Sequence, residues 1–150
     1  DIGGTKIATA IMEYPADGGV PHPVFEAEVP TEAQEGGEAV FQRIEASIKA
    51  ALEANPDVEV LGVGIGAAGV VDPKTGAIAY ANEIMPGWSG VQLGAASARG
   101  PRAFPLPLYG DVQAHALGEA HWGVGKGKVL RLVFGTSVRA SAAHMSRTAA

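Results

Sequence analysis

The sequence predicts an α/β fold, in which helices pack against a largely buried sheet, and three observations support this. Apolar residues recur at three-to-four spacing between 31 and 55, as in a helix that buries one face. Short apolar runs that are typical of strands cover 7–12, 58–71 and 104–111. A second helical pattern starts at residue 111, so helix and strand alternate along the later part of the chain.

The first half of the chain is expected to hold a strand pair and a helix. The strand 7–12 leaves a Gly-Gly turn, and a Pro- and Gly-rich stretch then leads to an extended segment, 24–30. The helix 31–55 is ended by Pro56, which cannot continue it. Its predicted buried face consists of Val40, Phe41, Ile44, Ile48 and Leu52.

The middle of the chain is expected to be rich in strands and turns. The apolar run 58–71 is typical of a buried strand that ends in a Gly-rich loop. The stretch 72–78 is a strong turn signal and leads to a short strand, 77–81. A loop and then a short helix are expected over 86–100.

The last third is expected to begin with the strand 104–111, which has an acid at its exit. The following helix places Ala114, Leu117 and His121 on one face, and a final strand covers 129–136. The tail 137–150 is rich in Ala, Ser and Arg and has no strand pattern.

Composition excludes several classes of protein. The chain has 150 residues, of which 47% are hydrophobic, and can bury one sizeable core. Its net charge of −5 argues against a nucleic-acid partner, because such a protein normally presents a basic face. The absence of Cys excludes a disulfide framework and fits a cytoplasmic location. No apolar stretch reaches the roughly 18 residues of a membrane helix, so no membrane partner is expected.

The chain opens with DIGGTK, which is both a turn and a candidate phosphate site. As a turn, Gly-Gly is one of the commonest two-residue hairpin loops. As a phosphate site, Gly3 and Gly4 would let backbone N–H groups approach an anion, with help from the Thr5 hydroxyl and the Lys6 charge. Asp1 would then serve Mg²⁺, which prefers a carboxylate together with waters and phosphate oxygens.

Two further stretches carry possible chemistry. Gly64, Gly66 and Gly69 spell the G-x-G-x-x-G of dinucleotide sites, but a turn and a strand follow instead of a helix, which disfavours that interpretation. Asp111, at the exit of a buried strand, is either a helix N-cap or a base that accepts a proton from a bound hydroxyl. His115 and His121 fall on different faces of the predicted helix, so zinc is not expected.

These stretches, in this order, resemble the ROK family of bacterial sugar kinases and sugar-responsive repressors, within the actin-like ATPase superfamily. The resemblance is carried by DIGGTKIA, GVGIGAAGVVDPKTGAI, PGWSGVQL and GDVQAHALGEAHWGVGKG, and extends to about residue 136. It implies an actin-like ATPase (ribonuclease H-like) fold and ATP-dependent phosphorylation of a hexose, as in bacterial glucokinases.

The resemblance also implies roles for individual residues. Asp1 would organise Mg²⁺, and Asp111 would be the catalytic base. A sugar hydroxyl would lie near Gly69 and Asn82. The residues that would approach ATP are Gly3, Gly4, Thr5, Lys6, Gly135 and Thr136.

The chain departs from the family pattern in several places. Gly110 stands where the family has an Asn that contacts the sugar, and Ala68 replaces a more usual Pro. The later Glu-x-Gly-His and Cys-rich zinc motifs are absent. We therefore expect a truncated or frame-shifted copy with little or no activity alone. The resemblance also implies that full-length relatives form homodimers.

The implied organisation is an N-terminal lobe over 1–108, the start of a second lobe over 109–136, and a tail outside the family over 137–150. Two alternatives stay open beside the kinase: a fragment of a sugar-responsive repressor, which would need a helix-turn-helix, and a non-catalytic sugar-binding remnant.

Overall fold

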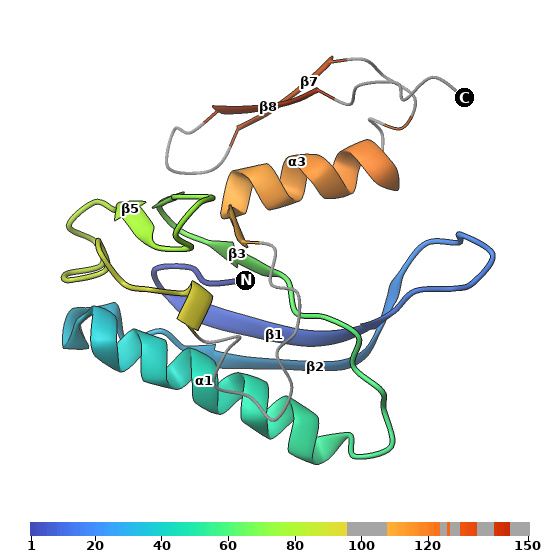
Figure 1. Cartoon of the computed structure of the whole chain (residues 1–150), viewed down its shortest axis with the longest axis horizontal. Coiled ribbons are helices and arrows are strands. Elements are labelled where there is room, and N and C mark those ends of the chain that lie inside the picture. Colours follow the sequence, from blue (N-terminus) through green and yellow to red (C-terminus); the bar gives the residue numbers. More distant parts are fainter. Residues whose placement is uncertain (96–107, 124–125, 127–129, 135–139, 145–150) are drawn as a thin grey trace.

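The computed structural model describes residues 1–95, 108–123, 126, 130–134 and 140–144. Figure 1 shows helix α1 (Gly37–Ala54) on one face of a sheet and helix α3 (Asp111–His121) on the other. A hairpin of strands β7 (Leu130–Phe134) and β8 (Ala140–His144) lies beyond α3. This layered arrangement of helices around a sheet is the predicted α/β architecture.

The sheet joins two strand pairs. Strands β1 (Lys6–Glu13) and β2 (His22–Pro30) form an antiparallel hairpin. Strands β3 (Ile65–Ala67) and β6 (Leu108–Gly110) pair in parallel.

Ile2 connects the two pairs. It bridges Ile7 of β1 in antiparallel fashion and Ala67 of β3 in parallel fashion. Its N–H donates to the carbonyl of Gly66 at 2.7 Å, and its own carbonyl accepts from the N–H of Ala68 at 2.8 Å. The order across the sheet is therefore β2, β1, Ile2, β3, β6.

The β1–β2 hairpin accommodates two prolines because of its register. Ala8 exchanges backbone hydrogen bonds with Asp1, so the even-numbered residues of β1 direct their backbone groups away from β2. Pro23 and Pro30 lie opposite even-numbered residues of β1. Neither proline therefore stands where the ladder requires an N–H.

The core lies between α1 and the sheet. Val40, Phe41 and Ile44 are buried, as the helical spacing predicts, and they pack in one cluster with Ile2 and Ile7. The same cluster continues through Ile65, Ala67, Ile78, Met85, Trp88 and Leu93. The DIGGTK turn and the strand ends are thus built on one continuous apolar core.

The observed helix begins later than the predicted helix 31–55. Residues Ala33–Glu35 form a separate 3-10 turn, η1, and α1 begins only at Gly37. Gly36 separates them with a φ of 94°, a conformation that an α-helix cannot contain. The predicted end at Pro56 is confirmed, because α1 stops at Ala54.

The buried strand expected before the Gly-rich loop of 58–71 is wrong over 58–64. Within the range only Ile65–Ala67 and the short strand β4 (Val70–Val71) are paired strands, and the Leu61 side chain is 80% exposed. The first described pairing along this stretch involves Ile65, and the glycines at 62 and 64 have low strand propensity.

The turn after the Gly-rich loop is confirmed. Strand β4 pairs antiparallel with β5 (Ile78–Tyr80), and the turn 72–77 joins them. Because a hairpin and not a helix follows Gly69, the dinucleotide-binding interpretation is excluded.

Two expectations in the last third are corrected. Helix α3 buries Val112, Ala116 and Ala120, spaced by four, while His121 is exposed. The tail contains a strand after all, since β8 pairs antiparallel with β7. Its small Ala and Ser residues carry no alternating pattern, so pairing with a neighbour and not local propensity accounts for the strand.

The expected loop lies within the described part of the chain, and Gly94 and Ala95 after it are helical, whereas residues 96–100 of the expected helix and 104–107 of the expected strand lie outside the described part. Among the described helices, none is both long and apolar enough to cross a membrane.

Candidate active site

The site forms where β3 and β6 end, around Gly66. A Cβ placed on Gly66 would lie 3.7 Å from Oδ1 of Asp1 and 3.7 Å from the Cα of Asp111. It would also lie 3.4 Å from the Cβ of Ala114 in α3. Gly66 therefore lies close to both the carboxylate of Asp1 and the backbone of Asp111, the two acids that the sequence singled out, although 110 positions separate them in the chain.

The DIGGTK turn is tightly bonded on its protein side. The N–H of Gly3 donates to the carbonyl of Lys6 at 3.0 Å and closes the turn. The carbonyl of Gly3 accepts from the Thr31 hydroxyl at 2.7 Å, and the carbonyl of Thr5 accepts from the Thr31 N–H at 3.0 Å. The turn predicted from Gly-Gly is confirmed, and it lies next to Asp1.

Asp111 is the first residue of α3, and Gly110 precedes it as the N-cap. Its Oδ1 accepts from the N–H of Val112 at 2.8 Å, and its side chain is part-exposed. The Gly110 N–H donates to Oε1 of Gln113 at 3.2 Å, which supports the start of the helix. Asp111 is thus held at the exit of β6, within the first turn of the helix.

The Gly69 loop lies against Gly110. A Cβ on Gly110 would approach the carbonyl of Gly69 to 3.2 Å. The indole N–H of Trp88, a fully buried side chain, donates to the carbonyl of Ala68 at 2.8 Å and anchors the loop. Ala68 therefore keeps its carbonyl in a defined direction although it is not a proline.

The segment that contains Asn82 spans two parts of the site. Ala81 lies within 3.7 Å of a Cβ built on Gly69, and the Cγ2 of Ile84 lies within 3.2 Å of one built on Gly4. Asn82 is exposed between these two contacts. The structure thus brings Asn82 into the neighbourhood of both the Gly69 loop and the DIGGTK turn.

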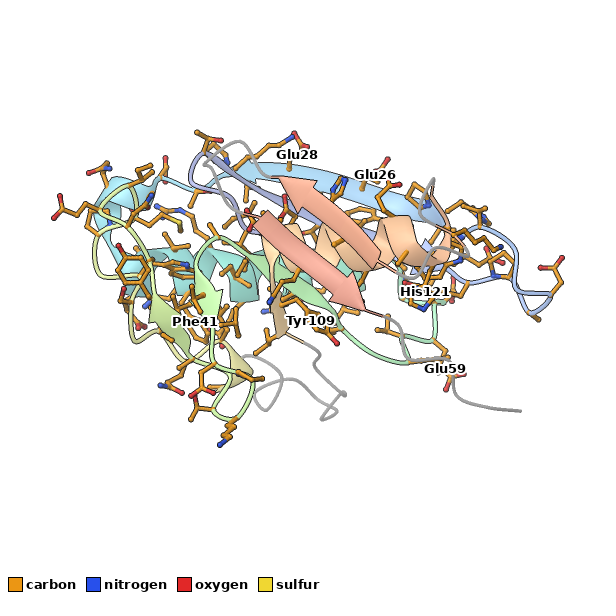
Figure 2. All side chains as sticks on the ribbon, turned by 90° about the horizontal axis from the view of Figure 1, so that it is seen from above. Glu26, Glu28, Phe41, Glu59, Tyr109 and His121 are labelled. Carbon is orange, nitrogen blue, oxygen red and sulfur yellow. The ribbon has the colours of Figure 1, made fainter. Side chains whose placement is uncertain are left out.

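Lys6 points to a different partner. Its ammonium forms an ion pair with Oε1 of Glu28 on β2 at 2.5 Å, and both side chains are more than half exposed. Figure 2 shows Glu28 well apart from Tyr109, which precedes Gly110 and Asp111. Gly135 and Thr136, the other expected nucleotide contacts, lie outside the described residues.

Several residues that support the site were missed by sequence reasoning. Thr31 is fully buried and bonds the turn twice, and Arg43 donates to the Thr31 carbonyl at 3.1 Å. Arg43 also pairs with Glu32 and Glu35, and the hydrogen bond to Glu35 raises the pKa of the guanidinium. No local motif marks these residues, because each acts on a segment distant in the sequence.

The residues present fit Mg²⁺ bound together with a nucleotide. Within the part of the chain that the structure describes, no three His, Cys, Asp or Glu side chains gather into a metal-binding group. Mg²⁺ does not require such a cage, since it keeps several waters and takes phosphate oxygens. The exposed Asp1 carboxylate, beside the space that Gly66 leaves open, offers the single protein ligand that this arrangement needs.

Comparison with known proteins places this chain in a family. The sequence model of the ROK family matches residues 1–138. An uncharacterised protein of Clostridium perfringens is 32% identical over an alignment of 142 residues, which covers 92% of this chain and 44% of that protein.

Solved structures agree. A ROK hexokinase from Thermus thermophilus superposes with a TM-score of 0.71 at 26% identity, covering 94% of this chain and 44% of that one. A ROK family glucokinase from Streptomyces griseus, solved with glucose and AMPPNP, gives a TM-score of 0.68 at 28% identity, covering 94% and 41%. The chain spans less than half the length of each of these relatives. It is a member of the ROK family, and its fold is that of the N-terminal part of the actin-like ATPase fold of ROK sugar kinases.

Proposed function

We propose that this chain carries the phosphate-binding and proton-accepting half of an ATP-dependent hexose kinase. The observation that supports this most directly is that the carboxylate of Asp1 and the backbone of Asp111 both lie close to Gly66, beside the DIGGTK turn. A phosphoryl transfer site needs an acid near the metal and phosphates, and another near the attacking hydroxyl.

In the proposed reaction, the turn formed by Gly3, Gly4 and Thr5 lies beside the phosphates of ATP and offers them the N–H of Gly4, because the N–H of Gly3 is bonded to the Lys6 carbonyl. Mg²⁺, held by Asp1 and phosphate oxygens, would neutralise negative charge during the transfer. Asp111 accepts the proton of a sugar hydroxyl as that oxygen bonds to the γ-phosphorus. The bond from the γ-phosphorus to the bridging oxygen breaks, ADP leaves, and the sugar phosphate remains.

The proposed sugar subsite comprises the Gly69 loop, Asn82 and Asp111. The choice of a hexose rests on the ROK hexokinase and glucokinase among the solved relatives. Gly110 supplies no side chain to the sugar, so one hydroxyl contact is missing. A lost hydrogen bond of this kind costs about 0.5–1.5 kcal/mol where water replaces it. We expect this chain alone to bind sugar weakly and to turn over little or not at all.

The test begins with nucleotide binding. Adding Mg²⁺ and AMPPNP to the ¹⁵N-labelled chain should shift the backbone amide signals of Gly3, Gly4 and Thr5. Asp1→Asn should weaken this binding by about 10-fold, a typical loss for one charged contact of about 1.4 kcal/mol. Asp57→Asn, in an exposed turn after α1, is the matched control and should change nothing. If the nucleotide leaves the three amides unshifted, the proposed phosphate site is wrong.

The second test concerns Asp111. With ATP, Mg²⁺ and glucose, mannose, fructose or an N-acetylated hexosamine, any phosphorylation by the chain should fall by at least about 100-fold in Asp111→Asn. The nucleotide affinity of that variant should be unchanged, since Asp111 is assigned to the sugar hydroxyl. Where the parent chain forms measurable product, an equal rate in the variant would show that Asp111 is not the base.

Gly110 favours one alternative, a sugar-binding remnant without catalysis. The two functions are separated by calorimetry with the same sugars. Sugar binding that is independent of Mg²⁺ and nucleotide, with no product formed, would support the remnant.

A further inference from the structure

We propose that Thr31 and Arg43 are positioning residues that orient the DIGGTK turn so that its Gly4 N–H faces the nucleotide phosphates. This inference rests on the proposed function for the phosphate contact, but the orientation of the turn can be tested without any ligand.

The first step is the position of Thr31. Among the described residues, Thr31 is the one buried polar residue, with 0% exposure. Its hydroxyl donates to the Gly3 carbonyl at 2.7 Å, and its N–H donates to the Thr5 carbonyl at 3.0 Å. Thr31 therefore holds carbonyl groups on both sides of Gly4.

The second step follows from the geometry of the peptide bond. In a planar trans peptide, the C=O and the N–H point in opposite directions. The carbonyl of Gly3 and the N–H of Gly4 belong to one peptide unit. Because the Gly3 carbonyl is directed at the buried Thr31, the Gly4 N–H is directed away from Thr31. Without such a restraint a Gly-Gly unit is free to rotate, since glycine has few steric limits on φ and ψ.

The third step is the support of Thr31 itself. Its carbonyl accepts from Nη1 of Arg43 on α1 at 3.1 Å. Nη2 of Arg43 lies 2.5 Å from Oε2 of Glu32 and also pairs with Glu35. Glu32 has a φ of 49°, which is uncommon for a residue other than glycine. Arg43 thus ties the chain directly after Thr31 to the helix that forms the core.

The charge of Arg43 makes this support specific. Its side chain is 25% exposed, less than those of the two acids, at 53% and 57%. A planar guanidinium can bond a carbonyl and two carboxylates at once, whereas an ammonium is a point charge. Lys49, on the same helix, pairs only along the helix surface with Glu53 at 3.7 Å. Lys49 therefore provides a matched control.

The hydroxyl of Thr31 is tested by amide hydrogen exchange on the chain without ligand. Thr31→Val removes the hydroxyl and keeps the shape, so the Gly3 amide, bonded to Lys6, should exchange about 2- to 12-fold faster. Amides of α3, such as those of Ala116 and Ala120, should keep their rates. Thr31→Ser retains the hydroxyl and should restore the rate at Gly3. An equal rise at Gly3 and in α3 would show general destabilisation and overturn the proposal, as would no change at Gly3.

Arg43 is tested in the same way. Arg43→Met should speed exchange at the amide of Thr31, Arg43→Lys should restore part of the protection, and Lys49→Met should have no effect there. Equal effects of Arg43→Met and Lys49→Met would overturn the role of Arg43.

A ligand measurement separates this inference from the proposed function. Mg²⁺ with AMPPNP should shift the Gly4 amide in the parent chain and in Thr31→Ser, and shift it much less in Thr31→Val. If exchange responds as expected but the nucleotide shifts no turn amide in any variant, the orientation by Thr31 stands and the phosphate site fails. If the nucleotide shifts Gly4 equally in Thr31→Val, the positioning role is wrong and the phosphate site stands.

Discussion

Gly69 shows how a single missing side chain shapes the candidate site. Its φ is 115°, and a Cβ there would come within 2.9 Å of the Tyr80 carbonyl. Gly69→Ala should therefore lower the free energy of unfolding by about 1–3 kcal/mol, through backbone strain and the close contact. Urea denaturation followed by circular dichroism measures this.

Gly64 is the control for that substitution, because it belongs to the same Gly-rich run. A Cβ on Gly64 meets nothing within 4 Å among the described residues, and its φ is not in the positive range. Gly64→Ala should change stability by no more than about 1 kcal/mol, in either direction. Equal losses at the two positions would mean that neither strain nor contact explains Gly69.

Substitutions of Gly66 are expected to change ligand affinity more than stability. A methyl group there would make only ordinary contacts of 3.4 Å or more, with Ala114, Asp1 and Asp111. Gly66→Ala should thus fold with a stability near that of the parent chain, while Gly66→Val fills the space between the acids. The valine variant should bind Mg²⁺ and AMPPNP about 10-fold more weakly, measured by calorimetry. Unchanged affinity would show that this space is not used.

At the scale of elements, the turn between β4 and β5 carries a pH dependence. Oδ1 of Asp72 accepts from the Lys74 N–H at 2.8 Å, and Oδ2 accepts from the Thr75 hydroxyl at 3.0 Å. These bonds lower the pKa of Asp72 below its ordinary value of about 3.9, and the bond from the Lys74 N–H has the largest effect. The stabilisation is present above that ordinary value and is lost as the pH falls through the lower pKa of the folded state.

The variant Asp72→Asn tests this, since its side chain does not titrate. The difference in unfolding free energy between the parent chain and the variant should be constant from pH 7 to about pH 5 and should shrink below about pH 4. A difference that stays constant down to pH 2 would remove Asp72 as the cause.

Elements with a strong local pattern could be predicted from the sequence. The buried face of α1 and the end of that helix follow from side-chain spacing and from Pro56. The start of α1 could not be placed, because it depends on the conformation of Gly36. The stretch 58–64 is largely apolar but is not a strand. This could not be predicted, because an apolar run does not reveal whether a neighbouring strand is available to pair with it.

The candidate site shows the same division. The motif residues Asp1, Gly3, Gly4 and Asp111 could be chosen from the sequence through their chemistry and the family resemblance. Thr31 and Arg43 could not, since a Thr after a Pro and an Arg on an amphipathic helix are ordinary on their own. Their contacts arise only when the hairpin and α1 come together in the fold.

At the scale of the whole molecule, the layers explain how distant segments of the chain reach the site from both faces of the sheet. Figure 1 shows α1 and α3 on opposite faces of the sheet, with the DIGGTK turn near the N-terminus between them. Thr31 and Arg43 act on the turn from the α1 side, and Asp111 reaches the site from the α3 side. The site therefore depends on both helices being docked on the same sheet.

The bridge made by Ile2 has a consequence for the order in which the chain folds. The β1–β2 hairpin involves neighbouring segments and needs only a short loop to close, whereas Ile2 meets Ala67 only after a long loop has closed. Contacts between distant segments slow folding and tend to form after local ones. The hairpin should thus appear early in refolding, and the halves of the sheet should join late, together with the arrival of Asp111 beside Asp1.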